Sequence, residues 1–151
     1  MEWLTTWSAA TGLPGLFIAS FLAATIVPFS SEAVVAAAAL GPWSTLALLA
    51  TATTGNWLGG LTTYAIGRWC DARTIARWLR TDPRKAERWQ HQVGRYGAWC
   101  ALLTWVPFIG DPIALALGVF RVRSLPVAVL MLVGKAARYA VIIIGLRALS
   151  A

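Results

Sequence analysis

Charged residues are scarce in this sequence, since only 13% of its 151 residues are Asp, Glu, Lys or Arg. A soluble domain of this size carries about twice that fraction. Residues 1–67 contain no Lys or Arg, so the chain lacks the basic segment that opens a secretory signal. One histidine and two cysteines, Cys70 and Cys100, give neither a metal-ligand spacing nor a nucleophile–base set. We therefore expect no enzyme, no metal and no cofactor.

Apolar residues dominate the composition. They make up 58% of the chain, which also contains nine tryptophans. Tryptophan favours the membrane–water interface, where its ring can be apolar and its N–H can meet water. The composition predicts an all-α integral membrane protein with a single membrane domain over residues 1–151.

The first two apolar runs are each too short to cross a bilayer. Leu13–Val27 has 15 residues and Ala33–Leu40 has eight, whereas a spanning helix needs about 20. The polar break Pro28–Glu32 separates them. Two half-length helices joined by a polar tip predict a re-entrant hairpin, which is tolerated where it is buried in protein or lines a wet cavity. The alternative is one long kinked span from Leu13 to Leu40.

Two later segments, Trp43–Arg68 and Ser124–Gly145, are long enough to cross the membrane once each. In the first, Gly55 and Gly59 form a small-xxx-small pair that lets another helix backbone approach closely. We assign helix packing to four glycines of this segment: Gly55, Gly59, Gly60 and Gly67.

The connector over residues 69–95 differs in kind from the rest. Eight of the 13 Lys and Arg residues lie between 68 and 95, interleaved with apolar and aromatic residues. Asp82-Pro83 is typical of an N-cap followed by proline at the first helical position. We expect two short amphipathic helices on the cytoplasmic membrane surface, in contact with anionic lipid rather than nucleic acid.

An internal repeat emerges when the chain is shifted by 79 residues. Only eight of 44 positions over 25–68 are identical, but the matches fall at positions that would shape the hairpin and the spanning helix. They include the hairpin break and the mid-helix glycines Gly55 and Gly134, and the acid Glu32 aligns with the acid Asp111. Each repeat, about 13–68 and about 96–147, would comprise a re-entrant hairpin and a spanning helix.

Charge placement predicts that the two repeats have opposite orientations. The positive-inside rule places 68–95 and 121–123 in the cytoplasm and the N-terminus outside. The hairpins would then enter from opposite sides, with their tips meeting near the midplane. Secondary transporters use this architecture, with the binding site at the repeat interface. A body this small is also compatible with a homodimer.

Four charged residues fall within predicted membrane segments: Glu32, Asp111, Lys135 and Arg138. Each costs about 2.5–3.5 kcal/mol on insertion scales, so each needs a compensating partner or function. One interpretation is structural, because two acids and two bases can form ion pairs that lock the bundle.

The other interpretation is functional. Lys135 and Arg138 are three residues apart and share a helix face, which suits a phosphate or carboxylate headgroup. The two acids could alternate between pairing with these cations and carrying a proton. Three further residues could donate hydrogen bonds in the cavity, or simply join helices: Ser31, Asn56 and Tyr64.

At these motifs the sequence resembles the DedA family of bacterial membrane proteins, also called the SNARE-associated or VTT-domain superfamily, and in particular its short YqaA-type branch. The matching stretches are Pro28–Glu32, Gly55–Gly60 with Tyr64 and Gly67-Arg68, Arg95–Gly97, Pro107–Pro112, and Gly134-Lys135 with Arg138-Tyr139. The resemblance implies an inner-membrane location, two re-entrant hairpins and movement of polyprenyl-phosphate or phospholipid, dependent on proton motive force.

One departure from the family pattern bears on the substrate. Longer members carry arginines on either side of the second hairpin's proline, where this chain has Thr104 and Gly110. Our first hypothesis is a lipid-phosphate flippase that can be coupled to protons. The alternatives are a transporter of a small ion or solute, and a non-transporting assembly protein with structural ion pairs.

Overall fold

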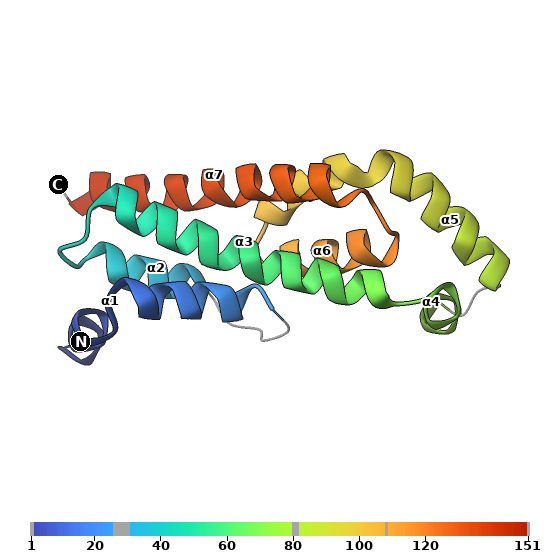
Figure 1. Ribbon diagram of the computed structural model, residues 1–151. Coiled ribbons are helices and arrows are strands. Elements are labelled where there is room, and N and C mark those ends of the chain that lie inside the picture. Colours follow the sequence, from blue (N-terminus) through green and yellow to red (C-terminus); the bar gives the residue numbers. More distant parts are fainter. Residues whose placement is uncertain (1, 26–30, 80–81, 108, 151) are drawn as a thin grey trace. The chain divides into compact units, whose positions relative to one another are not determined.

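The computed structural model describes residues 2–25, 31–79, 82–107 and 109–150, and every regular element in these ranges is a helix (Figure 1). The break at Pro28–Ser30 lies outside the described residues. The chain divides into two compact units, one of residues 1–59 and 135–151 and one of residues 60–134. Two long helices are shared between the units: α3 (Thr45–Trp69) is divided after Gly59, and α7 (Ser124–Ser150) is divided before Lys135.

The first unit contains α1 (Glu2–Ala23), α2 (Ser31–Ala39), the first half of α3 and the second half of α7. Gly12 interrupts α1 with a φ of 55°, a left-handed conformation that glycine adopts without a steric penalty. Helices α1 and α2 pack against each other as separate helices (Figure 1). This is the arrangement of a helical hairpin, and its entry into a membrane from one side stays a prediction.

Glycines on α3 bring its backbone into contact with that of α1. A Cβ added at Gly55 would lie 2.5 Å from the carbonyl oxygen of Phe17, and one at Gly59 would collide with the carbonyl oxygen of Phe21. Only glycine fits at such a distance. The helices of the first unit also enclose a buried apolar cluster of Leu16, Val35, Ala38, Leu48, Ala52, Tyr139 and Ile143.

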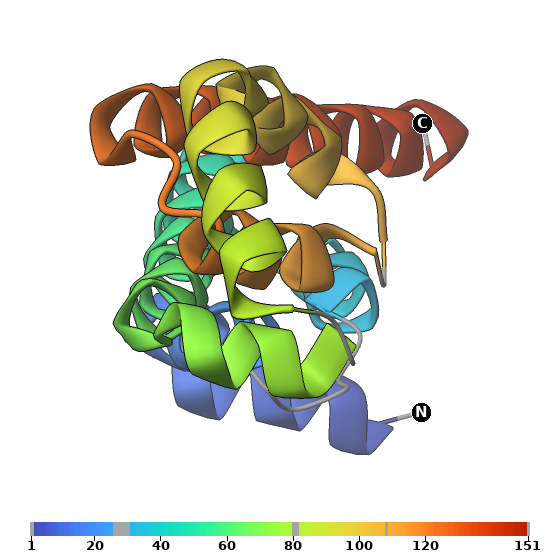
Figure 2. The same ribbon diagram turned by 90° about the vertical axis from the view of Figure 1, so that its right-hand side faces the viewer.

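The second unit contains the predicted connector, which does form two helices, α4 (Ala72–Leu79) and α5 (Pro83–Tyr96) (Figure 2). The Asp82 carboxylate accepts a hydrogen bond of 2.8 Å from the backbone N–H of Arg84, and Pro83 follows the cap, as the sequence predicted. Before α4, the Asp71 carboxylate accepts a 2.7 Å bond from the Thr74 N–H. That bond lowers the pKa of Asp71 below its ordinary value.

A pair of short helices completes the second unit. The apolar run that follows α5 coils into a 3₁₀ helix, η1 (Gly97–Trp105), and packs against α6 (Gly110–Val119). A 3₁₀ helix of nine residues is unusually long. A Cβ at Gly110 would collide with the backbone carbonyl of Thr104, so the start of α6 lies directly against the end of η1.

Glycines also mediate the contact between α3 and α6. A Cβ at Gly67 would collide with the carbonyl oxygen of Leu115, and a Cβ at Gly118 would collide with that of Tyr64. One glycine on each helix therefore accommodates the backbone of the other. The helix-packing role predicted for Gly67 corresponds to this contact with Leu115.

The C-terminus of α6 is closed by a Schellman motif. The N–H of Val122 donates to the carbonyl of Leu117 at 3.0 Å, and Arg121 adopts a left-handed φ of 53°. The carbonyl of Val122 accepts hydrogen bonds from the Tyr64 hydroxyl at 2.5 Å and from Arg68 at 3.3 Å. Tyr64 and Arg68 thus attach the turn after α6 to α3.

Helix starts follow the 79-residue offset of the repeat. Helix α2 begins at Ser31 and α6 at Gly110, while α3 begins at Thr45 and α7 at Ser124. Both pairs of starts differ by 79 positions. The opposite membrane orientation of the two repeats stays a prediction.

Of the two predicted spans, one meets the requirements of length and apolarity. Among the described helices, only the segment Ser124–Leu149 of α7 is both long and apolar enough to cross a membrane. Helix α3 has 25 residues, but threonines, glycines and Asn56 lower its apolarity. Several of these polar residues are buried within the protein, namely Thr53, Asn56 and Thr63.

The close contact at Gly118 generates a stability prediction. Gly118→Val should lower the free energy of unfolding by about 3 kcal/mol, because its Cβ meets backbone rather than a flexible side chain. Gly145→Val is the matched control, since nothing lies within 4 Å of a Cβ built there. Thermal unfolding in detergent measures both variants, and equal stability of the two would contradict the packing described here.

Candidate functional site

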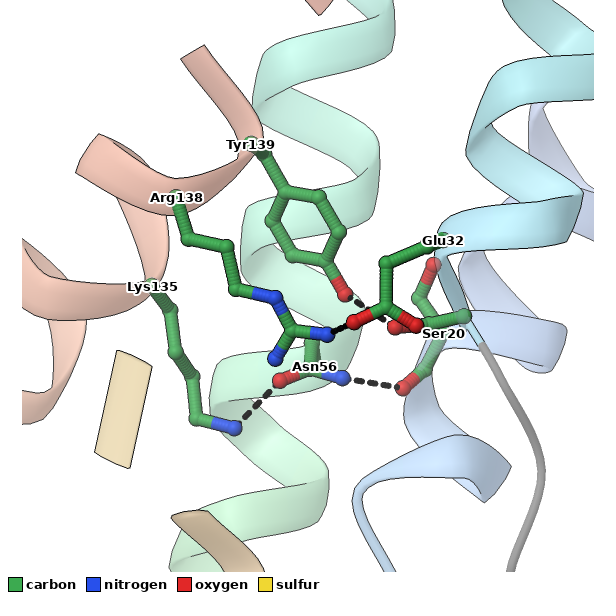
Figure 3. Close-up of polar contacts among 7 residues, drawn as sticks. Ser20, Glu32, Asn56, Lys135, Arg138 and Tyr139 are labelled. Carbon is green, nitrogen blue, oxygen red and sulfur yellow. Dashed lines mark hydrogen bonds and ion pairs between the residues drawn. The ribbon is translucent and has the colours of Figure 1, made fainter. Parts of the chain in front are cut away.

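Three of the four charged residues predicted in membrane segments come together in the first unit (Figure 3). Glu32 lies in the first turn of α2, while Lys135 and Arg138 lie one helical turn apart on α7. Lys135 is 1% exposed, and the side chains of Arg138 and Glu32 are 12% and 27% exposed. A short helix that begins with an acid therefore faces two cations from a long apolar helix.

The guanidinium of Arg138 forms an ion pair with the carboxylate of Glu32. It also lies 5.5 Å from the centre of the Tyr139 ring, within the range of a cation–π contact. Tyr139 is fully buried, and its hydroxyl donates a 2.8 Å hydrogen bond to the hydroxyl of Ser31. Adjacent residues of α7 thus bind adjacent residues at the start of α2.

Lys135 contacts a different element. Its ammonium donates a hydrogen bond to the side-chain oxygen of Asn56 on α3. The amide nitrogen of Asn56 in turn donates a 3.1 Å bond to the backbone carbonyl of Ser20 on α1 (Figure 3). One asparagine therefore connects three helices of the unit through its two polar atoms.

The interior of this unit holds further polar atoms. The hydroxyls of Ser20 and Thr53 and the Nε of Arg138 are buried and find no hydrogen-bond partner in the part of the chain that the structure describes. Buried donors of this kind are costly, because each has lost its water. Unsatisfied polar atoms in the same unit as Lys135 and Arg138 make its interior suited to a polar ligand or to bound water.

The structure places the remaining predicted residues as follows. Asp111 lies in the first turn of α6 and belongs to the second unit, where Tyr64 anchors the turn at Val122. Gly55 and Gly59 lie against α1, Gly67 against α6, and Gly60 is buried on α3. The site in the first unit thus comprises Ser31, Glu32, Asn56, Lys135 and Arg138 of the predicted set.

Sequence reasoning did not assign roles to Ser20, Tyr139 or Arg147. Ser20 acts through its backbone carbonyl, which every residue has, so no sequence signal marks it. Tyr139 could have been found from its place beside Arg138 on the same turn. Arg147 donates a 2.7 Å hydrogen bond to Thr45 and another to the carbonyl of Trp43, which joins the end of α7 to the start of α3.

Comparison with known proteins places the chain among bacterial membrane proteins. The family model described as the VTT domain matches residues 27–147. The chain is 41% identical to the inner membrane protein YqaA of Escherichia coli K12 over 133 residues, which cover 87% of this chain and 89% of that protein. The YqaA of Shigella flexneri matches with the same identity and the same coverage.

A more distant relative is an uncharacterized protein of Haemophilus influenzae, which is 36% identical over 84 residues. That match covers 54% of this chain and 48% of the relative. No solved structure matches the chain significantly.

The ion pair yields a double-mutant prediction. Glu32→Gln or Arg138→Gln alone should destabilise the protein by about 3 kcal/mol, because either change leaves a largely buried charge without its partner. The double variant should be more stable than the sum of the two single effects predicts, by at least about 1 kcal/mol. Unfolding in detergent measures this coupling.

Arg147→Gln combined with Glu32→Gln is the matched control. Arg147 lies on the same helix, nine residues after Arg138, and donates hydrogen bonds to Thr45 and to the carbonyl of Trp43, so its effect should simply add to that of Glu32→Gln. Additive effects for the Glu32 and Arg138 changes as well would show that the ion pair contributes nothing to stability.

Proposed function

The chain belongs to the VTT-domain family of membrane proteins and resides in the bacterial inner membrane, and from this premise we propose that it moves a lipid with a phosphate headgroup across that membrane. Polyprenyl phosphates and phospholipids both present such a headgroup. In this proposal the protein is a transporter, and neither a metal nor a catalytic residue takes part.

The observation that carries the proposal is the pair of buried cations on α7. Lys135 and Arg138 lie on the described helix that is long and apolar enough to span a membrane, and both are shielded from solvent. Charged residues at such positions are retained mainly where they serve an ion or substrate. A phosphate suits them chemically, because arginine offers a planar fork and lysine a compact charge.

Glu32 supplies a means of coupling transport to protons. Its carboxylate forms an ion pair with Arg138, so a phosphate that enters the site must compete with Glu32 for the guanidinium. A proton bound by Glu32 would neutralise the carboxylate and free Arg138 for the substrate. Loss of that proton would restore the ion pair and favour release of the phosphate.

The second hairpin offers no cations at the two positions where longer family members carry arginines, which supports assigning the phosphate to α7. Family resemblance places arginines of longer members at the positions of Thr104 and Gly110, but here Thr104 is buried and Gly110 lies against its carbonyl. A side chain at position 110 would collide with that backbone. Lys135 and Arg138 are therefore the candidates for binding the phosphate.

The ion pair itself also favours a rival, in which the protein is a membrane assembly factor and Glu32–Arg138 only holds α2 to α7. Exchanging the charges, with Glu32→Arg and Arg138→Glu together, separates the two. The assembly function should survive the exchange, because the ion pair is kept. Phosphate transport should be lost, because the acid would then sit beside Lys135.

The connector extends the proposal to a second lipid contact. Helices α4 and α5 present exposed arginines, among them Arg73, Arg77, Arg84 and Arg88. Such a basic surface next to a membrane helix attracts anionic headgroups, by about 1 kcal/mol for each residue close to the bilayer. We assign this surface to anionic lipid of the cytoplasmic leaflet. A homodimer is compatible with the proposal and is not required by it.

Reconstitution in liposomes tests the transport function. The parent should move a fluorescent polyprenyl phosphate between leaflets, faster with a proton gradient, whereas Glu32→Gln should abolish the effect of the gradient. Arg138→Ala should slow movement at least about tenfold, since it removes a charge-assisted contact to the phosphate.

Arg147→Ala is the control for Arg138→Ala, because it removes the same side chain from the same helix outside the charged cluster. It should retain transport if it folds. A parent that moves no polyprenyl phosphate and no phospholipid, with or without a gradient, would rule the proposal out. Equal loss in both arginine variants would point to stability instead of substrate binding.

A further inference from the structure

Asn56 is the neutral member of the charged cluster, and its position is set by the glycines next to it. A Cβ at Gly55 would lie 3.2 Å from the Cβ of Ser20, so α1 and α3 are in backbone contact at this level. That closeness lets the amide nitrogen of Asn56 reach the backbone carbonyl of Ser20 at 3.1 Å. The asparagine is therefore anchored on its donor side.

The anchor fixes the direction of the amide oxygen. A carbonyl such as that of Ser20 can only accept, and an ammonium such as that of Lys135 can only donate. The amide thus satisfies both neighbours in one orientation, with nitrogen toward Ser20 and oxygen toward Lys135 (Figure 3). The Asn56 oxygen thus gives the ammonium of a long, flexible side chain an acceptor whose direction is set.

Asn56 and Lys135 also occupy equivalent positions of the two repeats, since they are 79 residues apart. They are in direct contact. When two repeats are related by a two-fold axis, a residue that touches its own equivalent lies next to that axis. Transporters built from inverted repeats place the substrate site at the repeat interface, where such an axis runs.

We propose that Asn56 is the positioning residue of the phosphate site, holding the Lys135 ammonium where the headgroup binds; this inference rests on the proposed function. An amide suits the task because it orients the ammonium without adding a negative charge that would compete with the phosphate. Arg138, in contrast, is held by the carboxylate of Glu32. In this proposal Lys135, held by the Asn56 amide, receives the phosphate, and Arg138 joins when Glu32 releases it.

The lysine content of the chain permits a direct test. Lys85 and Lys135 are the two lysines, so Lys85→Arg leaves Lys135 as the single source of signal in protein labelled with ¹³C at the lysine Cε. Farnesyl phosphate, a soluble prenyl monophosphate, is titrated into the purified full chain in detergent. In this background the probe should shift the Lys135 signal in a saturable manner, and farnesol, which lacks the phosphate, should not.

Asn56→Leu should weaken farnesyl phosphate binding about tenfold, which is the effect of losing one hydrogen bond to a charged group. Asn56→Asp should weaken it at least as much, because the new carboxylate pairs with Lys135. Thr54→Leu, an exposed position on the same helix, is the matched control and should bind as the parent does. Asn56→Asp retains a polar acceptor, so it decides the matter if Asn56→Leu does not fold.

An exchange of the two residues adds a readout that a merely structural role would not move. Asn56→Lys combined with Lys135→Asn keeps the contact and transfers the cation to the equivalent position of the other repeat. The ammonium then donates to the amide from α3 instead of α7, so the double variant should recover at least part of the binding that Lys135→Asn loses. Lys135→Asn alone should lose binding.

Each result separates this inference from the proposed function. Parent-like probe binding by both Asn56 variants, or a double exchange as inactive as Lys135→Asn, would overturn the positioning role. The absence of any shift of the Lys135 signal in the parent would overturn the assignment of the phosphate to Lys135. Binding that depends on Asn56 in a parent that moves no lipid in vesicles would leave the inference standing and remove the transport function.

Discussion

The contact between the backbones of α1 and α3 governs the arrangement of polar groups in the first unit. Gly55 and Gly59 lack the side chains that would hold the helices apart, so the carbonyl of Ser20 comes within hydrogen-bonding distance of Asn56. Asn56 then has its oxygen directed at Lys135. A buried ammonium in an apolar helix is tolerated because this series of contacts provides an acceptor for it.

A second series of contacts binds Arg138, whose partner is a charged carboxylate instead of a neutral amide. Glu32 and Ser31 at the start of α2 bind Arg138 and Tyr139 on one turn of α7. The first turn of a helix favours a negative charge, because the N–H groups there lack partners along the chain. Glu32 is thus stabilised by its helix and by Arg138 together, and the start of a half-length helix becomes a firm attachment to a long one.

Features of the structure could be predicted from the sequence where a residue type has an energetic cost in its place or a local capping role. Glu32, Lys135 and Arg138 were recognisable because charges inside apolar segments are expensive, and Asp82-Pro83 because its capping chemistry is local. The family assignment also followed from short motifs, and the VTT-domain match confirms it. By contrast, the pairing of Arg138 with Glu32 and of Lys135 with Asn56 depends on the rotation of each helix, which composition does not specify. The 3₁₀ form of η1 and the role of the Ser20 carbonyl have no signal in residue type at all.

The contact between Asn56 and Lys135 has a consequence for how such a chain could arise. If a single repeat once paired with an inverted copy of itself, the residue next to the two-fold axis would have faced its own duplicate. Two lysines in that place would repel each other inside the membrane, and two asparagines would provide no charge. Gene duplication and fusion remove this restriction, because each half can then change alone. A fused chain can therefore place a cation opposite a neutral amide. A symmetric dimer of identical halves cannot, because both halves would carry the same residue.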